Sequence, residues 1–166
     1  MEMGKVITES GMDFVADNTF YIEKSDLYAS LGAGVRSVEF LRLKDGKLLF
    51  VEAKTSFPDP NNPSVENPLN FQSEIDKICE KFIHSLNLFA SVEVGVNGNM
   101  FDVGLTLPEN ISLEFILVIK NHEIEWCKIV KAALNTNLPK YILKIWRPII
   151  YVINEENAAR WNLTVS

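Results

Sequence analysis

The chain has 166 residues, 47% of them hydrophobic and 23% charged, and its formal net charge is −6 at pH 7. This length suits one ordinary domain, which can bury a sizeable core without disulfides or structural metals. The longest apolar runs, such as residues 115–119, are far shorter than the roughly 20 residues of a membrane span, so we expect no membrane-spanning helix. The first ten residues lack the apolar stretch of a secretory signal. We therefore expect a cytoplasmic protein with a single domain over residues 1–166.

Charge is unevenly distributed along the chain. Residues 1–127 contain 10 basic and 20 acidic side chains, a balance of −10. Residues 128–166 contain six basic and two acidic side chains, a balance of +4. Such asymmetry permits a basic face on an acidic protein, although solvated lysines would give the same count.

The N-terminal third has a weak pattern. We expect a short strand over Phe20–Glu23. Ser25 is a suitable N-cap for a short helix that runs through Leu31 and ends at Gly32.

Two apolar runs with β-branched residues follow, Ser37–Leu43 and Leu48–Lys54, joined through residues 44–47. The join contains Asp45-Gly46, a favoured centre of a two-residue type I′ turn. The sequence therefore predicts a β-hairpin here.

A proline-rich segment, Phe57–Pro68, predicts a long surface loop, and long ordered loops are often functional. Apolar residues then recur every three or four positions, which predicts a helix from about Asn70 to about Ala90 with one buried face.

The remaining chain predicts strands and helices in alternation. The glycine-rich segment Val92–Leu107 fits either a hairpin or a loop. The elements after it are a buried strand at Ile111–Ile119, a helix at Glu123–Leu134, a strand at Pro148–Ile153 and a helix at Glu155–Trp161 capped by Asn154. A hairpin followed by this alternation predicts an α/β fold with a mixed central sheet flanked by helices.

The hairpin register places charged side chains together. With Asp45-Gly46 as the turn, paired residue numbers sum to 91, so Glu39 faces Glu52, and Lys54 shares their face. Two facing carboxylates repel each other unless a cation offsets them. That cation could be Lys54 or a divalent ion, since Mg²⁺ binds through one or two carboxylates together with waters and phosphate oxygens.

Two interpretations of this cluster remain open. The first is a solvated ion-pair cluster on the exposed side of the hairpin. The second is a metal site, which is favoured because the same face continues toward the turn as apolar residues, so that the charges gather at one end.

The order of Glu39, twelve intervening residues and Glu52-Ala53-Lys54 resembles the PD-(D/E)XK nuclease superfamily. The resemblance implies a restriction-endonuclease-like fold in which Glu39 and Glu52 bind Mg²⁺ or Mn²⁺ and Lys54 is the catalytic cation. It also implies that Gln72, at the start of the next helix, lies near the substrate. The family has a further acid from a leading helix, for which the sequence offers Glu9 and Glu23 as candidates.

Lys140, Tyr141, Lys144, Trp146 and Arg147 interleave cations with aromatic rings. This pattern suits stacking and phosphate contacts on single-stranded nucleic acid. An element edge with aromatic residues in the core and solvated lysines would give the same pattern. Elsewhere, we expect His84 at the surface, and His122 lacks a second ligand at zinc spacing.

The sequence is compatible with two functions. One is a metal-dependent nuclease that cuts nucleic acid phosphodiesters, with Glu39, Glu52, Lys54 and Gln72 at its site. The other is a non-catalytic interaction protein that retains the nuclease-like fold and binds a protein partner or nucleic acid. The net charge of −6 favours a nuclease that is recruited by a partner over one that acts alone.

Overall fold

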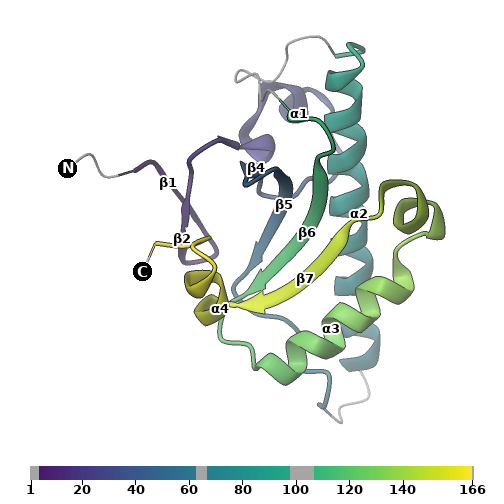
Figure 1. The fold of residues 1–166 in the computed structure, drawn as a ribbon. Helices are drawn as coiled ribbons and strands as arrows, with labels where there is room; N and C mark the ends of the chain where they lie inside the picture. Colours follow the sequence, from purple (N-terminus) through teal and green to yellow (C-terminus); the bar gives the residue numbers. More distant parts are fainter. Residues whose placement is uncertain (1–3, 63–66, 98–106, 166) are drawn as a thin grey trace.

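The computed structural model describes residues 4–62, 67–97 and 107–165, and a five-stranded mixed sheet forms its centre (Figure 1). β3, β4 and β5 pair antiparallel, whereas β5, β6 and β7 pair parallel. The structure confirms the predicted α/β class with a mixed central sheet. Across the sheet the strands are β3 (Thr19–Phe20), β4 (Phe40–Lys44), β5 (Lys47–Lys54), β6 (Ser112–Ile119) and β7 (Ile149–Asn154).

The predicted hairpin is β4 and β5. Asp45 and Gly46 both have positive φ, 50° and 74°, as a type I′ turn requires. The ladder runs from the pair Lys44–Lys47 to the pair Phe40–Val51, and all five pairs keep the predicted sum of 91.

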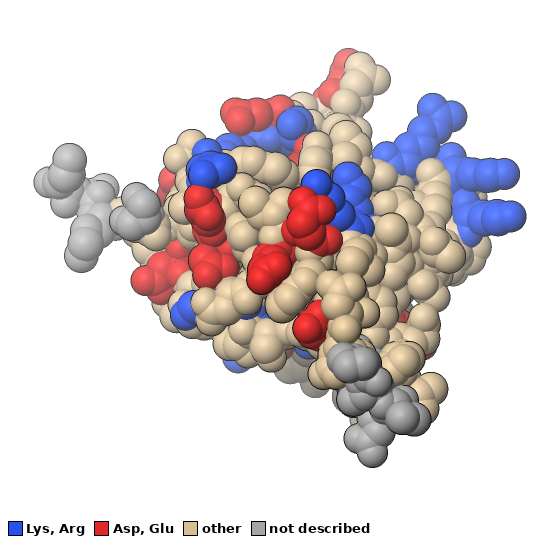
Figure 2. All heavy atoms as spheres, turned by 90° about the horizontal axis from the view of Figure 1, so that it is seen from below, with Lys and Arg blue, Asp and Glu red and all other residues tan. Residues whose placement is uncertain are grey.

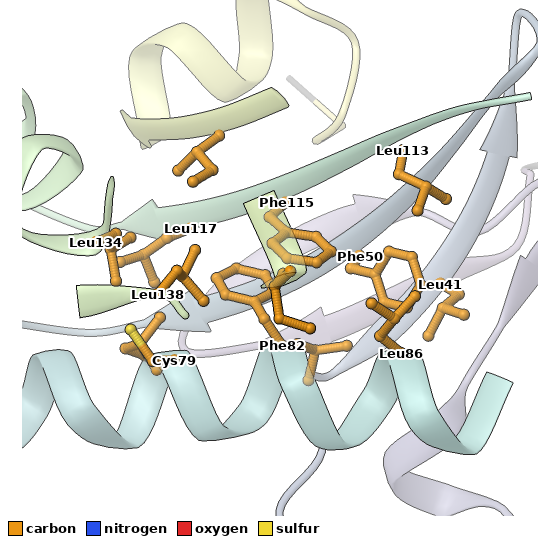
Figure 3. Packing of buried hydrophobic residues seen from close by; sticks show 14 of the residues in the cluster. Leu41, Phe50, Cys79, Phe82, Leu86, Leu113, Phe115, Leu117, Leu134 and Leu138 are labelled. Atoms are coloured by element: carbon orange, nitrogen blue, oxygen red, sulfur yellow. The ribbon is translucent and has the colours of Figure 1, made fainter. Parts of the chain in front are cut away.

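Two helices cover one face of the sheet, α2 (Asn67–Glu93) and α3 (Ile124–Asn137) (Figure 1). Side chains with even numbers on β5 point into the core beneath α2, as Phe50 does (Figure 3). Phe82 of α2 stacks on Phe115 of β6 with ring centroids 4.6 Å apart. This packing fixes the height of α2 over the sheet.

An N-terminal hairpin and the C-terminal helix lie on the other face (Figure 1). The hairpin consists of β1 (Val6–Glu9) and β2 (Met12–Val15), which pair antiparallel through a turn at Ser10-Gly11. Its residue Phe14 is fully buried against Phe40 in a second apolar cluster. The C-terminal helix is α4 (Glu155–Arg160).

Both predicted helix caps are present. Ser25 accepts a hydrogen bond from the Tyr28 N–H at the start of α1 (Asp26–Ser30), and Asn154 accepts one from the Asn157 N–H at the start of α4. The predicted strand at Phe20–Glu23 is wrong in its extent. β3 ends at Phe20, and Ile22–Lys24 forms a 3₁₀ turn, η1.

The long helix begins one turn earlier than predicted. Pro68 is in the first turn of α2, where a missing N–H costs nothing because no intrahelical acceptor is available to it. The predicted loop therefore stops short of Asn67, and its residues 63–66 lie outside the described chain. At the other end α2 continues to Glu93, a turn covers residues 94–97, and residues 98–106 also lie outside.

Between α3 and β7 the chain forms one π-helical turn, η2 (Ile142–Trp146), which ends at Arg147 in a left-handed conformation with φ of 50°. None of the helices in the described ranges has the length and apolar content needed to cross a membrane.

Candidate metal centre

The candidate site lies at the carboxyl end of β5, where the chain leaves the sheet toward α2. Glu52 and Lys54 continue the face that carries Phe50, so both point toward α2. In α/β sheets the carboxyl ends of parallel strands are the usual place for ligands, because the connections diverge there. Glu52 is fully buried, and Lys54 is partly exposed at the rim.

Glu39 lies immediately before β4 and next to this end of β5. Its N–H donates to the carbonyl of Val51, the residue that pairs with Phe40, at 3.0 Å. Glu39 and Phe40 therefore both oppose Val51, the two-against-one arrangement of a β-bulge. The expected direct pairing of Glu39 with Glu52 is not part of the ladder, although the two carboxylates remain close enough to influence each other electrostatically.

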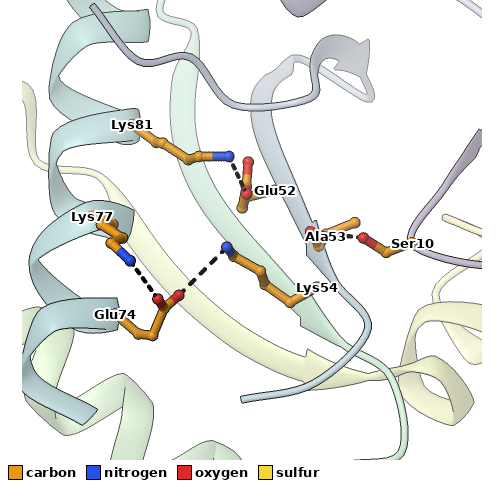
Figure 4. Close-up of polar contacts among 7 residues, drawn as sticks. All are labelled: Ser10, Glu52, Ala53, Lys54, Glu74, Lys77 and Lys81. Carbon is orange, nitrogen blue, oxygen red and sulfur yellow. Dashed lines mark hydrogen bonds and ion pairs between the residues drawn. The ribbon is translucent and has the colours of Figure 1, made fainter. Parts of the chain in front are cut away.

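Two more carboxylates join Glu39. Three carboxylate oxygens, one each from Glu9, Glu23 and Glu39, lie within 4.8 Å of one another. Glu23 is brought there by the η1 turn, whose Glu23 N–H donates to the Glu39 carbonyl at 3.4 Å. Glu9 is the last residue of β1, and the next residue, Ser10, donates from its hydroxyl to the Ala53 carbonyl at 3.1 Å (Figure 4). Three separate segments thus converge beside β5.

Two cation contacts connect the strand to α2 (Figure 4). The Lys81 ammonium donates to Glu52 Oε1 at 2.6 Å, with side chains only 18% and 1% exposed. About two turns toward the helix start, the Glu74 carboxylate binds Lys54 at 3.5 Å and Lys77 at 2.8 Å. Lys54, one of the two cations that the sequence offered beside the carboxylates, is therefore paired with Glu74 at the rim, and Lys81 is the cation bonded to Glu52.

Burial and mutual repulsion shift the acids toward their protonated forms. Burial, together with a hydrogen bond to Glu23 and repulsion from Glu52, raises the pKa of Glu39 to about 10. Burial raises the pKa of Glu52 to about 7, although the charges of Lys81 and Lys54 oppose the rise. Burial and the charge of Glu23 also raise the pKa of Glu9. Glu39 is therefore protonated at neutral pH.

Two carboxylate oxygens of the cluster lack a hydrogen-bond partner. Glu39 Oε2 and Glu52 Oε2 are buried and unpaired within the described part of the chain. A buried oxygen without a donor is costly, and ionised carboxylates in this setting need protons or a cation. Carboxylate oxygens are the ligands that Mg²⁺ and Mn²⁺ prefer. The donor set of Glu9, Glu23 and Glu39 therefore fits a hard divalent cation. Glu52, predicted as a metal ligand, is not among these three converging carboxylates and is bonded to Lys81 instead.

An open groove of about 580 Å³ begins at Lys54, and its lining does not include Glu9, Glu23, Glu39 or Glu52. It lies between the end of β5 and the first turns of α2, and its walls include Lys54, Lys77, Asn70 and Ser73. The lining offers ammonium, amide and hydroxyl donors, which are the groups that bind phosphate oxygens. Glu74 contributes one opposing charge and is already paired with both lysines.

Gln72 is not brought to this cluster. Its side-chain amide donates to Asp76 at 2.8 Å and to Asn137 at 2.9 Å, at the contact of α2 with the end of α3. The reason is helical geometry: Glu74, Lys77 and Lys81 follow the face that meets β5, and Gln72 lies on a different face. The role that the resemblance implies for Gln72 has no support from its position.

The two histidines also lie outside the cluster. His84 is half-buried and accepts a hydrogen bond from the Arg36 N–H at Nδ1. His122 is 5% exposed beside Phe57 and Trp126, and desolvation lowers its pKa.

Lys81 is the functional candidate that the sequence did not reveal, because it lies outside the apolar pattern that predicted the helix. The signal available was its position seven residues after Glu74, two turns along the same face. Glu9 was offered only as a candidate, and the hairpin that positions it was not predicted. Ser10-Gly11, a short turn between alternating residues, is the signal that marks the β1–β2 hairpin.

The chain was compared with family models, with curated proteins and with solved structures, and none of them matches it.

Proposed function

We propose that this chain is a metal-dependent phosphodiesterase that acts on nucleic acid, with a site of the PD-(D/E)XK kind. The observation that carries the proposal is the convergence of Glu9, Glu23 and Glu39 within 4.8 Å, beside the buried Glu52 and the rim residue Lys54. Both candidates for the leading acid, Glu9 and Glu23, lie in the cluster, but they come from the β1 strand and the η1 turn and not from a leading helix.

The residues divide into two roles. Glu9, Glu23 and Glu39 would hold Mg²⁺ or Mn²⁺, which supplies Lewis-acid polarisation of a phosphodiester and a more acidic bound water. Lys54 faces the groove and stabilises negative charge on phosphate oxygens as that charge develops. The donors of Asn70, Ser73 and Lys77 would orient the neighbouring phosphate within the same groove.

One observation favours the alternative, a non-catalytic interaction protein. Glu52 is fully buried and bonded to Lys81 at 2.6 Å. The Lys81 ammonium therefore already compensates the negative charge of this carboxylate, and no metal ion is needed for that purpose. In that case Glu39 would keep its proton, because burial raises its pKa to about 10, and the groove would bind a partner without bond cleavage.

Cleavage assays separate the two functions. End-labelled DNA and RNA oligonucleotides, single- and double-stranded, are incubated with Mg²⁺ or Mn²⁺ and resolved on a denaturing gel. Wild type should cut at least one substrate, whereas Glu39→Gln and Lys54→Ala should reduce the rate by at least about a hundredfold. Glu156→Gln, which alters an exposed carboxylate bonded to Arg160, is the matched control and should cut like wild type.

Thermal unfolding with Mn²⁺ is a second readout, which separates metal binding from bond cleavage. Lys54→Ala should keep the Mn²⁺-induced rise in melting temperature, whereas Glu39→Gln should lose most of it. A wild type that cuts no substrate and gains no stability from Mn²⁺ would refute the nuclease proposal. Equal cleavage by wild type and both variants would assign the activity to a contaminant.

A further inference from the structure

A basic and aromatic surface lies away from the acidic cluster, at the turn that connects α3 to β7. It comprises the exposed residues Lys140, Tyr141, Lys144, Ile145, Trp146 and Arg147, which we call the η2 surface. Tyr141 is 57% exposed, Ile145 72% and Trp146 39%. The aromatic rings are therefore not core residues, and the interpretation of this segment as an ordinary element edge is wrong on that point.

The cations of the η2 surface are not engaged in ion pairs within the described residues. Within residues 4–62, 67–97 and 107–165, no carboxylate forms an ion pair with Lys140, Lys144 or Arg147. By contrast, Lys128 on the preceding helix binds Glu125 at 2.9 Å. The sequence explains this, because residues 126–154 contain five cations and no carboxylate.

The chain has a net charge of −6, so a surface with unpaired cations differs in charge from the molecule as a whole. Figure 2 shows Lys and Arg side chains projecting together at one side, whereas acidic and basic side chains alternate over the rest of that view. Unpaired cations next to exposed rings complement a chain of phosphates that carries stackable bases.

The local backbone holds these side chains outward. The π-helical turn buries Ile142 in the main core, and the left-handed Arg147 reverses the chain into β7. Pro148 follows, so the turn cannot extend as a helix. The rings and cations are therefore presented from a short segment anchored at both ends.

We propose that the η2 surface binds single-stranded nucleic acid, with bases stacked on Tyr141 and Trp146 and phosphates at Lys140, Lys144 and Arg147. Single strands are favoured over duplexes because a base offers its face to an aromatic ring only when it is unstacked from its neighbours. The identity of the ligand rests on the proposed function, because the same polymer is the substrate proposed for the acidic cluster.

The η2 surface is separate from that cluster. Ile149 starts β7 and lies three residues before Val152, which is level with Glu52 across β6. Three residues along a strand and two strand spacings across the sheet place Ile149 roughly 14 Å from Glu52 between Cα atoms. The η2 surface would supply affinity for a nucleic acid strand that the acidic cluster cannot supply, because carboxylates repel phosphates.

The test measures binding without cleavage. Fluorescence anisotropy of a labelled dT15 strand, and of a duplex of mixed sequence with the same length, is recorded in EDTA at low salt. Wild type should bind the single strand more tightly than the duplex. Tyr141→Ala should weaken single-strand binding by about tenfold, and Tyr141→Phe, which keeps the ring, should bind like wild type.

The charged residues give an independent readout. Three phosphate contacts predict that the affinity falls with a slope of about −2 in a plot of log K against log salt concentration. The triple change of Lys140, Lys144 and Arg147 to Gln should bring that slope close to zero. Lys128→Gln is the matched control, because that lysine is already paired, and it should keep the wild-type slope.

The binding assay contains EDTA, which removes any metal, so it does not depend on cleavage. Nucleic acid binding by the η2 surface and cleavage at the acidic cluster can therefore be absent independently of each other. Absence of binding at low salt, equal affinity for duplex and single strand, or equal affinity of wild type and Tyr141→Ala would each overturn the inference. A concentration-dependent dimer that Ile145→Asp dissolves, without binding of dT15, would also overturn it by assigning the η2 surface to a second copy of the chain. Cleavage could persist in any of these cases.

Discussion

Lys81 on α2 donates to Glu52 on β5 across 2.6 Å, and this buried ion pair joins the long helix to the strand of the candidate site. Burial alone would lower the pKa of Lys81, but the charge of Glu52 raises it above its usual value. The partners depend on each other, since either charge left alone would stay buried without compensation.

Loss of Lys81 should therefore be costly. We expect Lys81→Met to reduce the free energy of unfolding by about 3 kcal/mol at pH 8, measured by urea denaturation. Lys77→Met removes a more exposed cation from the same helix and should cost less than about 1 kcal/mol. Adding Glu52→Gln to Lys81→Met should restore part of the loss, because no isolated charge remains. Equal costs for the two lysines would contradict this account of the pair.

The raised pKa of Glu39 predicts how stability depends on pH. A carboxyl group whose pKa is higher in the folded state stabilises the fold fully below its unfolded value of 4.5. This contribution is lost as the pH rises toward about 10 for Glu39, and toward about 7 for Glu52.

Glu39→Gln imitates the protonated acid, so it should be more stable than wild type by about 2 kcal/mol at pH 8, without metal, and near wild type at pH 5. Urea denaturation at several pH values, in EDTA, measures the difference. Glu125→Gln alters an exposed carboxylate and should follow the wild-type pH dependence. If the free energy of unfolding depended on pH in the same way for wild type and Glu39→Gln, ionisation of Glu39 would cost the folded state little stability.

Local features of the sequence predicted the frame of the site. Asp45-Gly46 set the hairpin and its register, and alternation along β5 then placed Glu52 and Lys54 on one face. The regular spacing of apolar residues predicted α2. These signals act over a few residues, and tertiary packing did not override them.

The rest of the site depends on contacts between distant segments. Glu9 reaches the cluster because Ser10 bonds to the Ala53 carbonyl, 43 residues away in the sequence. Glu39 departs from the predicted pairing because a bulge places it and Phe40 opposite Val51. No local pattern encodes either event, so the sequence offered Glu9 and Glu23 only as candidates.

The position of Gln72 predicts that it is dispensable for chemistry. Gln72→Ala should leave the rate of cleavage within about twofold of wild type, because its amide bonds to Asp76 and Asn137 instead of facing the groove. The lost hydrogen bonds are exposed and should cost about 0.5–1 kcal/mol of stability. Gel assays and urea denaturation of the same preparations test both statements. A large fall in rate with unchanged stability would restore Gln72 to the site.

The acidic cluster should couple metal binding to proton release. A divalent ion requires ionised carboxylates, and the pKa values of Glu39 and Glu52, about 10 and 7, mean that protons compete with the ion at neutral pH. Mn²⁺ should therefore stabilise wild type more at pH 8 than at pH 6. At a Mn²⁺ concentration one hundred times the dissociation constant, the free energy of unfolding should rise by about 2.7 kcal/mol.

Glu23→Gln should lose most of this gain, whereas Glu80→Gln, which alters an exposed partner of Arg36, should keep it. Thermal unfolding with Mn²⁺ and with EDTA at both pH values measures the effect. A gain that is independent of pH, or equal in wild type and Glu23→Gln, would place the metal elsewhere on the chain.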